Sequence, residues 1–99
     1  MKTVTSIKKA QKESLLLREI SGLFLEKSLD DSALSELFIS RVSLSDNKST
    51  CNVYFYTALG REVFDDVFEQ LKLYKPSLRK AIAQKIGGRY TPQIVFYFD

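Results

Sequence analysis

Residues 62–98, EVFDDVFEQLKLYKPSLRKAIAQKIGGRYTPQIVFYF, decide the fold, because two helical patterns follow one another around a proline and a strand pattern comes after them. From Glu62 to Leu73 apolar residues recur at three- and four-residue steps, and acids occupy the first turn, where the helix dipole favours them. Pro76 cannot lie inside an unbroken helix but suits the first position of a new one. We therefore expect a second helix from Pro76 to about Ile86, ended by Gly87 and Gly88.

Three strands are predicted around this helical pair. Residues 93–98 form a strand whose start suits Pro92. Upstream, residues 37–45 alternate in part, with Phe38, Val42 and Leu44 on one parity, and residues 51–57 alternate again. The polar residues 46–49 between them have turn chemistry, so the two runs predict a hairpin.

The chain opens with a longer helical pattern from Ile7 to about Lys27. The residues expected on its buried face are Ile7, Ala10, Ser14, Leu17, Ile20 and Phe24, with Leu16 and Leu23 widening the stripe. Residues 1–6 are predicted to be frayed, and residues 28–35, rich in Asp and Ser, are predicted to form a loop. The order α-β-β-α-α-β over 99 residues indicates one α+β domain.

Composition excludes several function classes. An apolar content of 44% with 27% charged residues is ordinary for a folded chain, and no apolar run approaches the roughly 20 residues of a membrane span. Histidine is absent and Cys51 is the one cysteine, which fits a reducing compartment. We expect a cytoplasmic monomer with no membrane contact, no cofactor and no small-molecule substrate.

Catalysis is not indicated. Asp65, Asp66 and Glu69 could hold a hard cation such as Mg²⁺, but a solvated acidic helix start explains them better. Cys51 lies on the apolar parity of a strand, where a free cysteine usually packs as a small core residue. Metal sites built from Cys and His clusters have no residues to use, so we expect no metal and no enzyme activity.

The separation of charge is the main functional signal, although the net charge is only +3. Residues 62–69 carry acids alone, whereas residues 72–89 carry bases alone, and a concentrated cationic stripe attracts polyanions. Both Arg79 and Lys80 are expected to point outward from the second helix of the pair. A smaller basic group lies near the N-terminus. The predicted RNA-binding residues are Lys8, Lys9, Lys12, Lys72, Lys75, Arg79, Lys80, Lys85 and Arg89.

Tyrosines supply a second, weaker signal. Tyr54, Tyr56 and Tyr97 share a parity that would place them on the sheet face away from the helices, where they could stack on unpaired bases. Tyrosine is also common on half-exposed strands, and from the sequence alone we favour that explanation.

Taken in order, these residues resemble the bacterial ribosome-binding factor A family, small-subunit assembly proteins with a type II KH-like fold. Residues 89–99, RYTPQIVFYFD, are similar to the family's final strand, a basic residue followed by x-x-Pro-Glu-Leu-x-Phe-x-Tyr-Asp, with Gln93 for Glu and Phe98 for Tyr. Residues 77–82 match its leucine- and arginine-bearing helix. The hairpin and Arg18-Glu19-Ile20 match earlier parts of the pattern, so the resemblance spans about residues 7–99.

Two positions depart from the family pattern. Asp30-Asp31 stands where the family usually has Asp-Pro, and Tyr74-Lys75-Pro76 replaces the usual Ala-x-Gly kink. A proline breaks the helix by a different route, so the fold expectation is kept.

The resemblance implies a three-stranded sheet with three helices on one face. It also implies binding to 16S rRNA on immature or cold-stalled small subunits and assistance to pre-rRNA processing by occupancy, without a chemical step. One alternative is a protein–protein adaptor of α/β sandwich type that binds no RNA. An acylphosphatase-like hydrolase is a third possibility, but Asn47 and Asn52 lie in or beside a hairpin turn with no anion loop.

Overall fold

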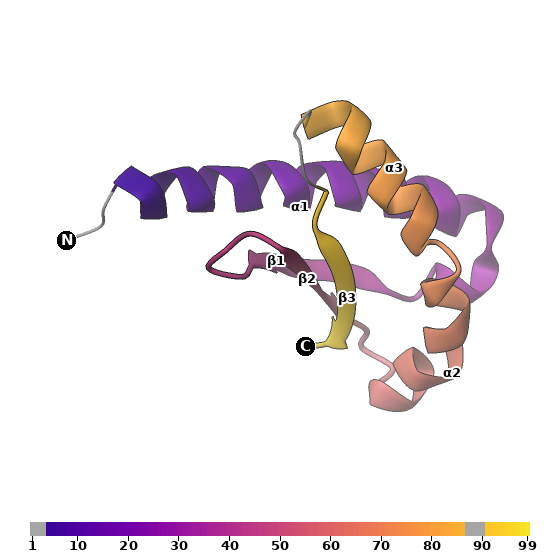
Figure 1. The fold of residues 1–99 in the computed structure, drawn as a ribbon. Helices are drawn as coiled ribbons and strands as arrows, with labels where there is room; N and C mark the ends of the chain where they lie inside the picture. The colour runs from indigo at the N-terminus through magenta and orange to yellow at the C-terminus, as the bar shows by residue number, and fades with distance from the viewer. Residues whose placement is uncertain (1–3, 87–90) are drawn as a thin grey trace.

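A computed structural model of the chain describes the backbone of residues 4–86 and 91–99 and the side chains of residues 8–85 and 91–99. Its elements are α1 (Val4–Asp30), a 3-10 turn η1 (Ser32–Leu34), β1 (Phe38–Leu44), β2 (Thr50–Tyr56), α2 (Arg61–Lys72), α3 (Lys75–Ile86) and β3 (Gln93–Phe98). The sheet order is β1-β2-β3, and the three helices pack on one face of the sheet, which confirms the predicted α+β class (Figure 1). None of the helices in the described residues is long and apolar enough to span a bilayer.

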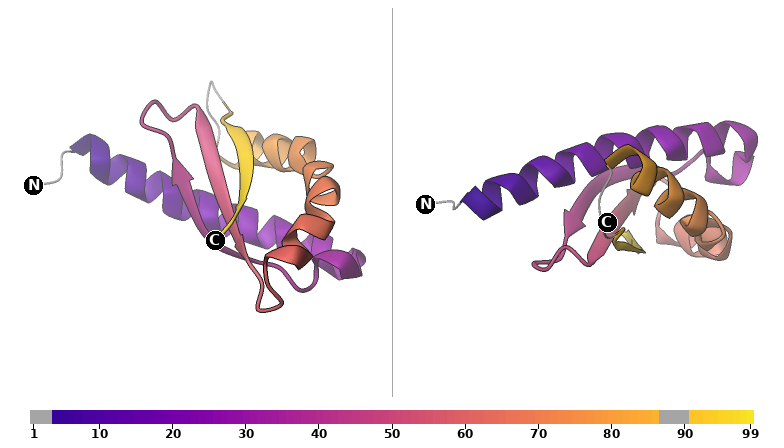
Figure 2. Two further views of the ribbon diagram at one scale, coloured as in Figure 1. Left: turned by 90° about the horizontal axis from the view of Figure 1, so that it is seen from below. Right: turned by 45° about the horizontal axis from the view of Figure 1, so that its top comes forward.

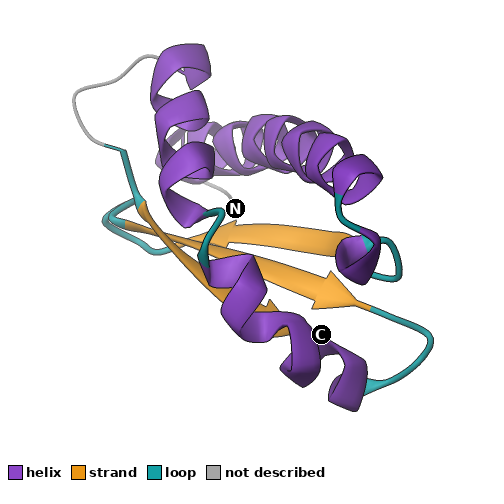
Figure 3. Ribbon diagram, turned by 90° about the vertical axis from the view of Figure 1, so that its right-hand side faces the viewer, coloured by secondary structure: helices purple, strands orange, loops and turns teal. Residues whose placement is uncertain are grey.

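The connection between β2 and β3 explains why the helical pair exists. β1 and β2 are antiparallel, as a hairpin requires, whereas β2 and β3 are parallel. Parallel neighbours need a long crossover, and α2 and α3 supply it along one side of the sheet (Figure 3). The predicted stop at Gly87 and Gly88 lies outside the described residues.

The helical break is built from residues 73–76. Leu73 and Tyr74 form a turn, and α3 begins at Lys75, one residue earlier than predicted, with the Leu78 amide donating to the Tyr74 carbonyl at 3.0 Å. Pro76 is the second residue of α3, where a missing amide hydrogen costs the helix nothing because the first four N–H groups have no partner within the helix.

Helix α1 is longer than its sequence pattern at both ends. It begins at Val4, within the segment predicted to be frayed, and it continues through Ser28 to Asp30, residues predicted to be loop. The Ser28 hydroxyl donates to the Leu25 carbonyl at 2.8 Å, so this polar side chain bonds to the helix itself instead of ending it.

The buried face of α1 is also shifted from the prediction. Leu16, Ile20 and Phe24 are buried at four-residue steps, while Ala10 and Ser14 are exposed. The first turns of α1 extend past the edge of the sheet, so they meet no apolar surface of the sheet there (Figure 1).

A β-bulge in β1 makes the predicted parity wrong for the residues that precede it. Val42 and Leu44 are buried as expected, but Phe38 is 63% exposed. The register with β2 shifts between Ile39 and Arg41, so Ser40 is an extra residue. One inserted residue moves every side chain before it to the other face of the sheet, and Phe38 is thereby turned away from the core.

One hydrophobic core lies between the sheet and the helices. Phe55 of β2 is at its centre, with ring centroids 5.2 Å from Phe24 of α1, 5.2 Å from Phe96 of β3 and 6.0 Å from Phe64 of α2. These contacts join two helices and a neighbouring strand to one ring. The opposite face of the sheet is not covered by any helix, as the view from below shows (Figure 2).

Candidate nucleic-acid interface

The predicted cations of α1 project from its overhanging half. Lys8 is exposed and Lys12 is half-buried. The Lys9 ammonium lies 3.3 Å from the Asp46 carboxylate in the hairpin turn, which ties the overhang to the sheet. A pair with so exposed an acid adds at most about 1 kcal/mol to stability and is screened by salt.

Glu13, the first acidic residue of α1, is hydrogen-bonded to the sheet. A Glu13 carboxylate oxygen accepts a hydrogen bond from the Leu44 backbone amide at 2.7 Å. This bond satisfies an outward N–H of β1, an edge strand, and it directs the carboxylate toward β1. Lys8, which is exposed, is the first charged side chain of α1 among the described residues.

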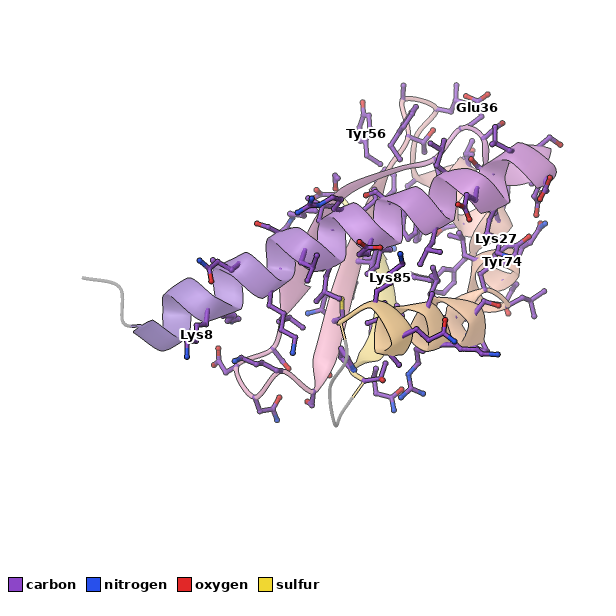
Figure 4. The ribbon with its side chains drawn as sticks, turned by 90° about the horizontal axis from the view of Figure 1, so that it is seen from above. Lys8, Lys27, Glu36, Tyr56, Tyr74 and Lys85 are labelled. Atoms are coloured by element: carbon purple, nitrogen blue, oxygen red, sulfur yellow. The ribbon has the colours of Figure 1, made fainter. Side chains whose placement is uncertain are left out.

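Two cations of α3 are the clearest candidates for contact with a polyanion. Lys80 and Lys85 are exposed, and no acidic side chain lies within 4.0 Å of either among the described residues. Lys85 lies where α3 passes α1, while Lys8 lies near the other end of α1, so both helices contribute cations to the helical layer (Figure 4).

Arg79 does not point outward as predicted. Its Nε donates to the Pro92 carbonyl at 3.3 Å and its Nη2 to the Thr91 carbonyl at 3.3 Å, and the side chain is half-buried. The guanidinium therefore anchors the segment that leads into β3. Two carbonyl acceptors match its fork geometry, which a lysine cannot reproduce.

Lys75 and Lys72 are also engaged within the protein. The Lys75 ammonium lies 5.1 Å from the centroid of the Phe96 ring, a cation–π contact at the β3 side of α3. Lys72 pairs with Glu69 at 3.0 Å on α2. Arg89 lies outside the described residues. Lys80 and Lys85 are thus both on α3 but point about 140° apart around its axis, while Lys72 lies on α2. Whether any of these cations contacts RNA stays a prediction.

The sequence reasoning missed a row of side chains on the uncovered sheet face. Arg41, Tyr54 and Tyr97 are cross-strand neighbours on β1, β2 and β3. The Arg41 guanidinium carbon lies 3.8 Å from the Tyr54 centroid, and the Tyr54 and Tyr97 rings are stacked with centroids 5.2 Å apart. The tyrosines were noticed from their parity. Arg41 faces the same way because it alternates with the buried Val42 and Leu44 and pairs with Tyr54 on the hairpin side of the bulge.

Cys51, Asp65 and Asn47, which were considered as possible catalytic or metal-binding residues, have structural roles. Cys51 is fully buried, and burial, with a smaller effect of the Glu13 charge, raises the pKa of its thiol to about 11, so the reactive thiolate is disfavoured. Asp65 pairs with Arg61 at 3.6 Å along α2. The Asn47 side-chain carbonyl accepts from the amide and hydroxyl of Ser49, which is turn chemistry. Within residues 8–85 and 91–99 there is no cluster of three or more possible metal ligands.

An uncovered three-stranded sheet, a helical pair inserted between its parallel strands, and cations on the helices define a KH-like domain of the type used to bind RNA. The family described as Ribosome-binding factor A matches residues 8–99. The chain therefore belongs to the ribosome-binding factor A family.

Individual relatives agree with this placement. A ribosome-binding factor A from Prochlorococcus marinus (strain MIT 9301) is 30% identical over 92 residues, covering 91% of this chain and 70% of that protein. One from Rickettsia prowazekii (strain Madrid E) is 26% identical over 103 residues, covering 98% and 78%. The crystal structure of ribosome-binding factor A from Thermus thermophilus superposes with a TM-score of 0.75 at 26% identity, covering 91% of this chain and 93% of that one.

Proposed function

We propose that this protein binds the small ribosomal subunit through its 16S rRNA and assists maturation of the pre-rRNA ends by occupying the immature particle. Family membership supports ribosome binding, since the relatives are named for it. The proposed mechanism is occupancy, with no chemical step, and the proposed place of action is the cytoplasm, where ribosomes are assembled.

The proposed RNA contact is supported above all by Lys80 and Lys85 of α3. Both lysines are exposed and have no acidic neighbour among the described residues. Lys8 and Lys12 of α1 extend the same charge over the helical layer. Phosphate contacts of this kind supply most sequence-independent affinity for nucleic acid, and the surrounding helices fix their spacing.

Co-sedimentation with purified small subunits tests the proposal. Lys80→Glu and Lys85→Glu are each expected to weaken binding about tenfold, because each replaces a phosphate contact with repulsion. Arg61→Glu is the matched control, since it makes the same charge change at an exposed helical position beside acids. If all three variants sediment with the subunit as the wild type does, the α3 cations are not the contact.

The salt dependence of the same complex gives a second measure. If about six phosphates are neutralised, the logarithm of the association constant should fall against the logarithm of salt concentration with a slope of roughly −4 to −5. A salt-insensitive complex would contradict the proposal. The processing role is tested separately, by looking for small-subunit rRNA with unprocessed ends in cells that lack the protein.

A further inference from the structure

The uncovered face of the sheet carries a continuous stack of flat side chains that runs across all three strands. Arg41 covers one face of the Tyr54 ring at 3.8 Å, and Tyr97 covers the other at a centroid distance of 5.2 Å with an interplanar angle of 22°. Because the strand order is β1-β2-β3, these two neighbours lie on opposite sides of Tyr54. In the view from below, no helix lies in front of the strands (Figure 2).

Hydrogen bonds hold the stack in place before any ligand arrives. Asp99 pairs with the Arg41 Nε at 3.5 Å, and the Ser40 hydroxyl donates to the same Asp99 oxygen at 2.7 Å. That hydroxyl also lies 3.1 Å from the Tyr54 carbonyl, so the bulge residue ties β1, β2 and the end of β3 together. Side chains fixed in this way lose little conformational entropy when they bind.

The Tyr97 end of the stack is open. Tyr54 is covered on both faces, whereas Tyr97 lies on the edge strand β3, is 43% exposed and has no second aromatic partner among the described residues. A flat group could therefore continue the stack on the outer face of Tyr97, one layer beyond the sheet edge.

The chemistry of this face suits a nucleobase better than a protein surface. Around the stack the face presents Ser43, Asn52 and Gln93, which can hydrogen-bond to base edges, with the aliphatic Val95 between them. The exposed Phe38 and Tyr56 form a cross-strand pair at one end of the same face. Protein-docking faces share the aromatic residues and the arginine, but serine is depleted in them, whereas Ser43 lies beside this stack. Arg41 adds an exposed guanidinium, paired through its Nε with Asp99, and guanidinium groups complement polyanions.

We propose that the sheet face binds an unpaired RNA base, which stacks on Tyr97 and extends the Arg41–Tyr54–Tyr97 row. This inference rests on the proposed RNA-binding function and adds a second contact surface to it, on the opposite side of the sheet from the helical cations. Stacking between a base and an aromatic side chain tolerates any base and neutralises no phosphate, so the stacking contact itself adds little salt dependence.

A short single-stranded RNA carrying one 2-aminopurine tests the proposal, because the fluorescence of this base is quenched when it stacks. Wild-type protein should quench the probe. Tyr97→Ala should remove the quench and weaken binding about tenfold. Tyr97→Phe should keep both, since the ring remains, and Tyr56→Ala, an exposed tyrosine outside the stack, should bind within twofold of the wild type.

The controls separate this inference from the proposed function. Tyr97→Leu, which keeps apolar bulk without a ring, replaces Tyr97→Ala if the latter does not fold by circular dichroism. If Lys80→Glu weakens RNA binding while Tyr97→Ala and Tyr97→Leu bind and quench as the wild type does, the stacking inference is wrong and the contact by the α3 cations stands. If the wild type binds no RNA, both are wrong. If the Tyr97 variants lose only a nuclease-resistant protein partner, the face is a protein-docking surface and the base-stacking inference is overturned.

Discussion

Tyr74 donates its phenolic hydrogen to the Asp31 carboxylate at 3.0 Å, joining the residue that follows α1 to the turn between α2 and α3. The same Asp31 oxygen accepts from the Gln70 side-chain amide, and the other oxygen accepts from the Ala33 amide at 3.1 Å. One carboxylate therefore caps η1 and fixes the helical turn from which α3, with its cations, departs. This acid is the second residue of the Asp-Asp pair that replaces the family's usual Asp-Pro.

Replacing Asp31 by alanine should destabilise the fold by about 2 kcal/mol, because a cap and two side-chain donors lose their acceptor. Urea unfolding followed by circular dichroism measures this change. Asp30→Ala is the matched control, since Asp30 is exposed and should change the free energy of unfolding by less than about 0.5 kcal/mol. Equal effects of the two variants would show that Asp31 does not hold the helical turn.

The Tyr74–Asp31 bond also predicts a loss of stability in alkali. The hydrogen bond to Asp31, followed by burial and the Asp31 charge, raises the pKa of Tyr74 above its ordinary value of 10.0. A group whose pKa is raised on folding contributes stability that is present below the unfolded-state pKa and is lost as the pH rises through the folded-state pKa. Thermal melts between pH 8 and 11 should therefore show a steeper alkaline decline for the wild type than for Tyr74→Phe. Identical declines would contradict the prediction.

Arg79 is predicted to contribute to stability as well as to charge. Arg79→Lys removes the two-carbonyl geometry but keeps the charge, and we expect it to lower the free energy of unfolding by about 1–2 kcal/mol. Lys80→Ala, one residue away and exposed, should change it by less than about 0.5 kcal/mol. If Arg79→Lys unfolds at the wild-type urea concentration, its contacts to Thr91 and Pro92 do not support the fold.

These residues show what the sequence could and could not predict. The element order, the hairpin and the helical break at Pro76 follow from local periodicity and turn chemistry, and the structure has all three. The orientation of Phe38 could not be predicted, because the bulge at Ser40 depends on pairing with β2 and leaves no local pattern. Charge segregation drew attention to Arg79, but its carbonyl partners lie 12 and 13 residues away and are set by the tertiary fold.

The same limit applies to the candidate site. Counting charges along the chain grouped Lys72 with the cations of α3, yet the helical turn at Leu73 and Tyr74 leaves Lys72 on α2 beside Glu69. Counting also gave no sign that Lys9 meets Asp46, because that pair depends on how far α1 extends over the hairpin. Sequence patterns therefore predicted which residues are charged, while tertiary packing decides which of those charges are free to meet a polyanion.

The Lys9–Asp46 pair offers a test in which RNA affinity should rise. Asp46→Asn removes an exposed negative charge and frees the Lys9 ammonium, so binding to small subunits should strengthen about threefold and the salt slope should steepen by up to about one phosphate equivalent. Stability should change by less than about 1 kcal/mol, because the pair is exposed on the acid side. The matched control is Asp66→Asn, which removes the same charge from exposed α2 without freeing a described cation. If both variants strengthen binding equally, the gain comes from net charge alone and Lys9 has no specific part in the contact.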